Sequence, residues 1–182
     1  MFFSKKSITP EEFVLFLSKQ RHYVEVSAIS TFQSELSYAG DIDRLKYEAL
    51  LFAMWLITLT IARSKESFKD YFHIKMIEAF KVNPELKDKF VMELDKRYKA
   101  YFKAFEIWMS APEKGYVLGS VMVEIIKNQN VASIIEGKSP QVGAVEAFKA
   151  TTLFSSLYKE ISDSVEALNK QYKFDLVYNE GK

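Results

Sequence analysis

Two pairs of acidic residues and histidines have the residue types and spacing that metal chemistry in a helical protein requires. Asp70 and His73 are three positions apart in one expected helix, and His22 and Glu25 are three apart in another. Helical bundles build di-metal sites from acid–histidine pairs on two helices and carboxylates on two more. One hypothesis for function is therefore a carboxylate–histidine metal enzyme with His22, Glu25, Asp70 and His73 as ligands.

Ordinary pairing on a helix surface explains the same spacing without a metal. An acidic side chain three or four positions from a histidine is its neighbour on any helix. The order of the His22–Glu25 pair is also the reverse of the usual order in di-metal bundles. Glu48, one of the carboxylates that would complete such a site, follows Arg44 by one helical turn and is expected to pair with it. The main interpretation therefore includes no metal and no other cofactor.

Glu124 is the only charged residue between Gly115 and Ile126, in a stretch that is otherwise almost wholly apolar. Because an unpaired carboxylate is costly to bury, Glu124 is expected on an exposed line of its helix or in a structural ion pair. The alternative is a polar anchor at the base of an apolar pocket. With the excess of aromatic residues, this alternative predicts a small apolar ligand bound near Glu124, His73 and Tyr101.

The sequence lacks the motifs of the common enzyme classes. It has no cysteine, which excludes disulfides, thiolate metal sites and cysteine nucleophiles. It also has no glycine-rich phosphate loop, no nucleophile elbow and no zinc-protease motif. We therefore favour a protein that is not an enzyme, with the metal hypothesis left as the exception.

The charge distribution argues against nucleic-acid binding. The 25 basic and 24 acidic residues give a net charge of +1, whereas nucleic-acid binding depends on neutralising many phosphates. Basic residues are concentrated between positions 63 and 103, where Lys89, Lys96 and Lys103 recur every seven residues and share a helix face. This face is expected to be solvated, with weak contact to an acidic partner as the alternative.

The stretch from Ala49 to Ala62 is the element around which the other elements must be arranged. It carries no charge, and threonines are its only polar residues. A helix that is apolar on every face must be surrounded, and this run is shorter than the roughly 20 residues that a bilayer core needs. The pattern predicts a buried central helix at residues 42–63 and a second buried helix at residues 115–128.

Prolines and capping residues mark the starts of the other helices. Thr9 and Glu12 form a capping box. Gly40 is expected to end the helix that precedes it, and Asp41 is expected to cap the central helix. Residues 23–29 alternate like a strand but have no partner strand, so residues 23–38 are predicted to be helical, with a kink from the first helix as an option. All four prolines are expected at helix starts: Pro10, Pro84, Pro112 and Pro140.

Apolar residues at both ends of the chain are expected to pack back on the same chain or on a second copy. These residues are Met1, Phe2 and Phe3 at one end, and Phe174, Leu176, Val177 and Tyr178 at the other.

The complete chain, residues 1–182, is predicted to form one all-α domain, a bundle of about six or seven helices. The favoured function is a non-catalytic helical module for protein interaction or regulation that self-associates as a homodimer. Binding of a small apolar ligand and metal catalysis are the alternatives. No membrane span is expected, and the absence of a signal-peptide pattern makes the cytoplasm the expected location.

Overall fold

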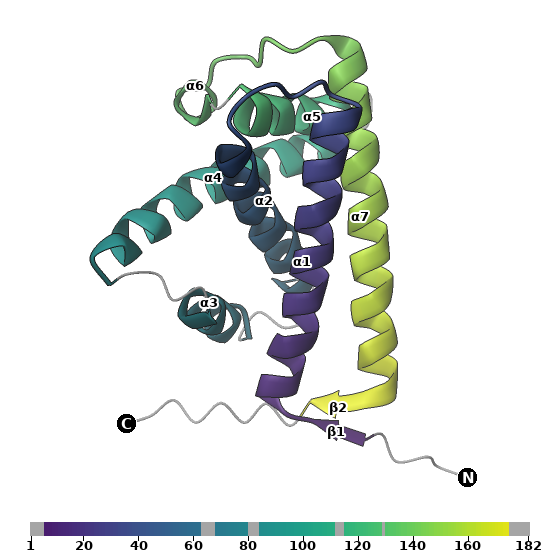
Figure 1. The fold of residues 1–182 in the computed structure, drawn as a ribbon. Helices are drawn as coiled ribbons and strands as arrows, with labels where there is room; N and C mark the ends of the chain where they lie inside the picture. The colour runs from purple at the N-terminus through teal and green to yellow at the C-terminus, as the bar shows by residue number, and fades with distance from the viewer. Residues whose placement is uncertain (1–5, 63–67, 80–83, 112–114, 129, 175–182) are drawn as a thin grey trace.

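The computed structural model describes residues 6–62, 68–79, 84–111, 115–128 and 130–174, and helices dominate this part of the chain. The described elements are β1 (Lys6–Ile8), α1 (Pro10–Ser34), α2 (Ile42–Ala62), α3 (Phe68–Ala79), α4 (Pro84–Ser110), α5 (Tyr116–Met122), the π-helical turn η2 (Val123–Lys127), α6 (Val131–Ile135), α7 (Ala144–Gln171) and β2 (Tyr172–Phe174). The prediction of an all-α bundle is confirmed (Figure 1).

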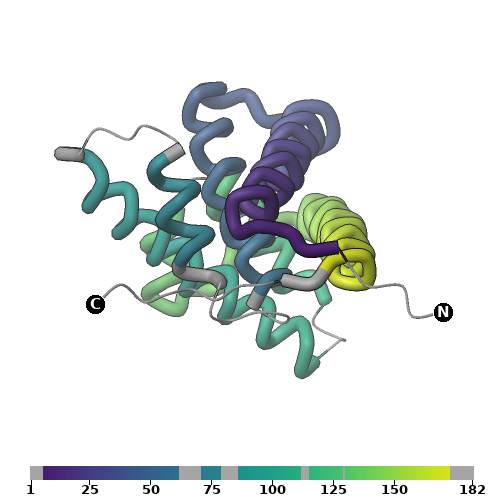
Figure 2. The backbone as a smooth tube through the Cα atoms, turned by 90° about the horizontal axis from the view of Figure 1, so that it is seen from below, coloured from purple at the N-terminus to yellow at the C-terminus, as the bar shows by residue number. Residues whose placement is uncertain are grey.

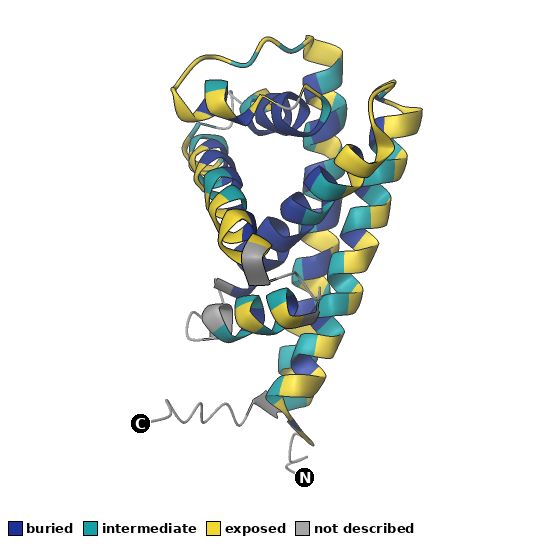
Figure 3. Ribbon diagram, turned by 60° about the vertical axis from the view of Figure 1, so that its left-hand side comes forward, coloured by how far each residue is buried: buried dark blue, intermediate teal, exposed yellow. Residues whose placement is uncertain are grey.

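The centre of the bundle is α2. Every residue from 51 to 61 is buried, and Trp55 and Leu56 have no exposed surface. The continuous segment of α5 and η2 is the second buried element, with residues 118–126 all buried. Figure 3 shows this burial along the inner helices and the exposed residues on the outer faces. The two apolar segments of the sequence are therefore the two elements that the other helices surround.

The long helices α1 and α7 lie side by side and run in opposite directions, as Figures 1 and 2 both show. Helix α1 also packs on α2, and α7 packs closely on α5. On the other side of α2, α4 packs against α2, α5 and α6, while α3 contacts α1 and α2. This arrangement places α4, α5 and α6 together at one corner of the molecule.

Helix α1 continues without interruption through the segment whose alternation resembles a strand. The predicted capping box is confirmed: Thr9 Oγ1 accepts from the Glu12 amide at 3.1 Å, and Glu12 accepts from the Thr9 amide at 2.8 Å. The expectation that Gly40 ends this helix is wrong, because α1 ends at Ser34 and the chain then turns at Ser37, which has φ 51°. Asp41 does cap α2, since its carboxylate accepts from the Asp43 amide at 2.9 Å.

The last helix begins later than its proline predicts. Helix α7 starts at Ala144 with Gly143 as its N-cap, so Pro140 lies in the preceding extended segment. The segment between α6 and α7 instead packs half-buried Val142 against the core, and the helix begins only after Gly143. Pro112 lies outside the described residues.

Gly119 lets α5 approach α7 closely, as its place in a buried apolar helix suggests. A Cβ atom on Gly119 would lie 2.0 Å from the Ala147 carbonyl oxygen and 2.3 Å from Thr151 Oγ1. Contacts this short leave no space for any side chain. The contact between these two helices therefore depends on the absence of a methyl group.

The two strands bring the ends of the described chain together. They pair in parallel, with Lys6 opposite Tyr172 and Ile8 opposite Phe174. The apolar terminal side chains to which the packing prediction refers (Met1, Phe2, Phe3, Phe174, Leu176, Val177 and Tyr178) lie outside the described part of the structure. Among the described residues, no helix combines the length and apolar character needed to cross a bilayer.

Candidate functional site

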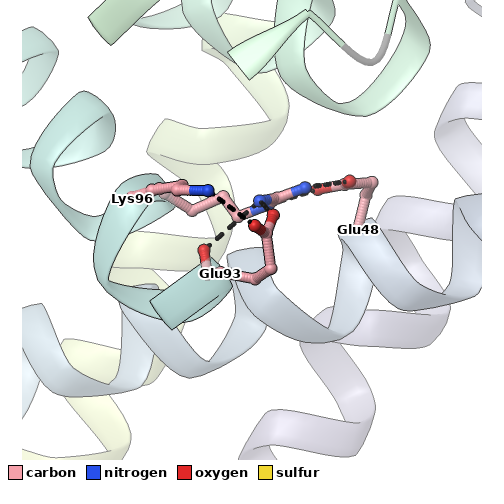
Figure 4. A network of polar contacts seen from close by, with 4 residues as sticks. Glu48, Glu93 and Lys96 are labelled. Carbon is pink, nitrogen blue, oxygen red and sulfur yellow. Dashed lines mark hydrogen bonds and ion pairs between the residues drawn. The ribbon is translucent and has the colours of Figure 1, made fainter. Parts of the chain in front are cut away.

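A buried ionic network connects α2 to α4 (Figure 4). Arg97 donates from Nε and Nη2 to the two oxygens of Glu48, at 2.9 and 2.6 Å. The other guanidinium nitrogen, Nη1, donates to Glu93, which also accepts from Lys96 at 2.8 Å. Only 3% of the Arg97 side chain and none of Glu48 is exposed. The two cations and two anions balance, so the network adds no net charge to the interior.

Burial and pairing act in opposite directions on these charges. Burial alone would lower the pKa of Arg97, but hydrogen bonds to Glu48 and then to Glu93 raise it above its usual value. The hydrogen bond from Lys96, followed by the one from Arg97, holds the pKa of Glu93 below 4.5. Glu48 therefore pairs with Arg97 rather than with Arg44, which corrects the prediction of a pair within α2. The reason is that Arg97 is buried opposite Glu48, while Arg44 is exposed.

A second polar cluster joins Thr58, His73 and Tyr98, from α2, α3 and α4. The three side-chain atoms Thr58 Oγ1, His73 Nε2 and Tyr98 Oη lie 2.9 to 3.0 Å from one another. Because Thr58 donates its single hydroxyl hydrogen to the Met54 carbonyl at 2.8 Å, its oxygen is left to accept from the other two groups. Burial raises the pKa of Tyr98, partly offset by the bond to Thr58, so the hydroxyl remains protonated. His73 therefore contributes to a bonded contact between three helices.

Tyr101, one turn further along α4, lies in the aromatic core. Its ring centroid is 4.9 Å from that of Trp55 and 5.7 Å from that of Phe52. Burial, and then the nearby Glu48 carboxylate, raises the pKa of Tyr101 well above its usual value. Its hydroxyl has no hydrogen-bond partner among the described residues. The ring of Tyr101 fills the core, and its polar atom is not directed at any hollow described below.

Glu124 is buried in η2 but is paired with amides and not with a cation. It accepts from Asn128 Nδ2 and from Asn130 Nδ2, each at 2.9 Å. Asn130 also caps α6, because its side-chain oxygen accepts from the Ser133 amide. The expectation that Glu124 lies on an exposed line or in an ion pair is wrong. Its partners follow it in sequence, so the carboxylate connects η2 to the start of α6.

The structure describes three of the four side chains in the acid–histidine pairs. His22 is exposed, and Glu25 pairs with Arg21 at 2.6 Å. His73 belongs to the cluster with Tyr98, while the side chain of Asp70 lies outside the described residues. Within the described ranges, no three histidine or acidic side chains are close enough to hold a metal ion.

An open groove of about 350 Å³ lies between α4 and α5 and is also lined by residues 137–140. We name it the α4–α5 groove. The described part of its lining contains no histidine and no carboxylate, and its charged residues are Lys103 and Lys138. Its apolar lining includes small and branched side chains from both helices and from α6: Ala100, Ala104, Ile107, Val117, Val121 and Ile134.

A second hollow, of about 360 Å³, lies on the other side of α6. We name it the α4–α6 hollow; it is bounded by Arg44, Lys96 and Arg97, with the carboxylates of Glu93 and Glu136. Two further hollows lie near Lys89 and near Phe148. None of these four hollows is lined by the predicted ligand-binding residues: Glu124, His73 and Tyr101.

Sequence reasoning missed Arg97, Tyr98 and Thr58 as members of the polar clusters. A signal for Arg97 was present, because it lies on the face of α4 that carries the apolar residues Phe90 and Leu94. A charged residue on an apolar stripe needs a buried partner, and Glu48 in the apolar central helix was a candidate of opposite sign. The two residues are 49 positions apart in the sequence, and no local pattern reveals a contact between residues so far apart.

Comparison of the chain with protein-family models, with curated proteins and with solved structures gives no match.

Proposed function

We propose that this protein is a non-catalytic helical module that recognises a segment of another protein in the α4–α5 groove. The observation that carries the proposal is the composition of the groove. It is open and largely apolar, and its described lining residues include no histidine or carboxylate that would act as a general base. Grooves with an apolar floor between helices are a recurrent means of binding an amphipathic helix or peptide.

The internal polar groups support binding over catalysis. Arg97 bonds to Glu48 and Glu93, and Glu124 bonds to Asn128 and Asn130. These charges are engaged in holding helices together, away from the lining of the groove. A catalytic acid or base would need to reach a reacting group on a substrate, so the arrangement favours recognition without chemistry.

An unbiased peptide-display selection on the purified protein tests this proposal. We expect peptides to be enriched on the wild-type protein, and enrichment to fall about ten-fold or more with Ser139→Trp, which fills the groove from its exposed edge. Thr152→Trp, at an exposed site on α7, is the matched control and should leave enrichment unchanged. Enrichment that is absent, or that is equal on Ser139→Trp and wild type, would contradict recognition in the groove.

Binding of a small apolar ligand is the competing function for the same groove, because its volume is within the range of ligand pockets. Native mass spectrometry of the purified protein separates the two. A small molecule that is bound to the wild type and absent from the Ser139→Trp variant would favour the ligand-binding function. We expect the spectrum of the wild type to show the protein without a bound small molecule.

Self-association is a second form of the proposal, and exposed apolar residues at the start of α7 favour it. Val145 and Phe148 are 69% and 70% exposed. Apolar side chains this exposed are typical of contact surfaces when they are adjacent. Sedimentation velocity should show a dimer that Phe148→Ser converts to a monomer. A wild-type monomer at all concentrations would rule out the homodimer and leave recognition of a different protein as the function. In either case we propose the cytoplasm as the location.

A further inference from the structure

We infer that the segment bound in the α4–α5 groove is acidic and amphipathic, with carboxylates that reach Lys103 and Lys138 on either side of an apolar anchor. This inference rests on the proposed function, since it names the chemistry of the partner at the same groove. Among the described residues, these two cations are the only charged side chains in the groove lining. A carboxylate of a partner at Lys103 would gain attraction directly, and one at Lys138 would replace Glu136, which pairs with that lysine.

Both lysines are available to a partner. Lys103 is exposed and has no ion-pair partner among the described residues. Lys138 pairs with Glu136 at 2.8 Å, but both side chains are exposed, at 67% and 58%. Exposed pairs of this kind contribute little and exchange readily with solvent. Lys138 can therefore turn to a carboxylate of the partner at small cost.

The α4–α6 hollow adds one further exposed cation. Arg44 lies in its lining and has no ion-pair partner among the described residues. The other charges of the hollow are already paired: Arg97 with Glu48 and Glu93, and Lys96 with Glu93. Glu136, which also lines the hollow, pairs with Lys138. A partner long enough to reach Arg44 would therefore gain from one more acidic residue at that position.

The floor of the groove defines the rest of the partner. Ala100 and Ala104 are one turn apart on α4 and buried, so the helix presents a low surface between Lys103 and α5. Val117 and Val121 form the opposite apolar wall. An aliphatic or aromatic side chain fits between these walls, with polar residues on the edges. A nucleic acid would meet this apolar floor with a phosphate backbone, and the net charge of +1 adds no general attraction.

Residue composition of the selected peptides tests the inference on the intact chain. The wild-type selection should enrich Asp and Glu together with Leu, Ile or Phe. With the double variant Lys103→Glu and Lys138→Glu, affinity for a synthetic selected peptide, measured by fluorescence anisotropy, should fall about ten-fold or more. Raising the salt concentration should weaken binding to the wild type and have less effect on the double variant.

A charge-matched control isolates the groove from the overall charge. The pair Lys99→Glu and Lys159→Glu makes the same change in net charge at two exposed lysines that lie outside the groove lining. It should retain wild-type affinity. Circular dichroism melting of each variant shows that the fold is intact.

The outcomes separate this inference from the proposed function. In one outcome, the selected peptides fail to bind the Ser139→Trp variant but have no acidic bias, or they bind the lysine double variant as well as the wild type. This outcome would contradict an acidic partner and leave recognition in the groove supported. Peptides insensitive to Ser139→Trp, or no enrichment at all, would overturn both. The wild type could instead bind a fluorescent single-stranded oligonucleotide more strongly than the peptide, with this binding lost in the lysine double variant. That result would show that the two lysines bind nucleic acid, and it would also overturn the inference.

Discussion

At the scale of single residues, two tyrosines one turn apart on α4 differ in the hydrogen bonding of their hydroxyl groups. The Tyr98 hydroxyl contacts Thr58 and His73 at 3.0 Å, whereas the Tyr101 hydroxyl has no partner among the described residues. A buried hydroxyl that is hydrogen-bonded stabilises the fold modestly, and one without a partner costs free energy. The same chemical group is therefore expected to have opposite effects at the two positions.

The pair of substitutions Tyr98→Phe and Tyr101→Phe tests this contrast. Tyr98→Phe should lower the free energy of unfolding by about 1 kcal/mol, because Thr58 and His73 lose a partner. Tyr101→Phe should leave it unchanged or raise it by up to about 1 kcal/mol, since only an unpaired hydroxyl is removed. Urea denaturation of both variants gives the comparison. Equal destabilisation by both would show that the Tyr101 hydroxyl also has a partner.

The Glu48–Arg97 pair is the residue-scale contact whose loss should be most costly. Removing one partner, as in Glu48→Leu or Arg97→Met, should destabilise the fold by about 3–5 kcal/mol because the other charge stays buried without it. The double variant should be clearly more stable than the sum of the single effects predicts. A double-mutant cycle in urea measures this coupling.

The exposed pair Lys99–Asp95 on the same helix is the control for that cycle. Lys99→Met should change the free energy of unfolding by less than about 1 kcal/mol, since exposed pairs are weak. If Arg97→Met had an effect as small as that of Lys99→Met, Arg97 would not be a buried, fully paired cation.

At the scale of elements, the contact between α5 and α7 depends on Gly119. Alanine normally stabilises a helix relative to glycine by about 1 kcal/mol. Here the added methyl group would meet the Ala147 carbonyl at 2.0 Å, a backbone atom that can move only with α7. The steric effect should therefore outweigh the helix preference.

Gly119→Ala tests the closeness of these helices. We expect a loss of about 1–3 kcal/mol in the free energy of unfolding, from overpacking. Gly143→Ala is the control, because no atom lies within 4 Å of a Cβ at that position, and its effect should stay within about 1 kcal/mol. Thermal melting followed by circular dichroism reports both. A Gly119→Ala variant more stable than the wild type would show that α5 and α7 lie further apart.

At the scale of the whole molecule, one hydrophobic core joins residues from every long helix. Phe13 and Phe32 of α1, Trp55 of α2, Phe72 of α3 and Phe154 of α7 belong to the same buried cluster. An interior shared in this way couples the helices, so that loss of one exposes the apolar faces of the others. This coupling is the physical basis for expecting a single domain.

Cooperative unfolding is the test of a single domain. Helix content by circular dichroism and the fluorescence of buried Trp55 with half-buried Trp108 should change in one coincident transition in urea. Two separated transitions would show that part of the bundle, such as α3 with α4, unfolds independently of α1 and α7.

The sequence by itself determined the class of fold and the identity of the buried helices. Residues 49–62 are apolar on every face, and residues 115–126 carry a single charge, so both segments require a helix that other helices surround. Local signals such as the Thr9–Glu12 capping box were also readable, because their partners are three residues apart. These features depend on short-range geometry that the order of residues specifies directly.

Only the tertiary structure decided which polar groups meet. Arg97 lies 49 positions from Glu48, and His73 is 15 and 25 positions from Thr58 and Tyr98. Such pairs depend on the angles and positions at which whole helices cross. The apolar periodicity of each helix does not specify this crossing geometry. The α4–α5 groove has the same origin, since it exists only where α4, α5 and the segment after α6 come together. The chemistry of this protein is therefore a property of helix packing, while its helical architecture is a property of local pattern.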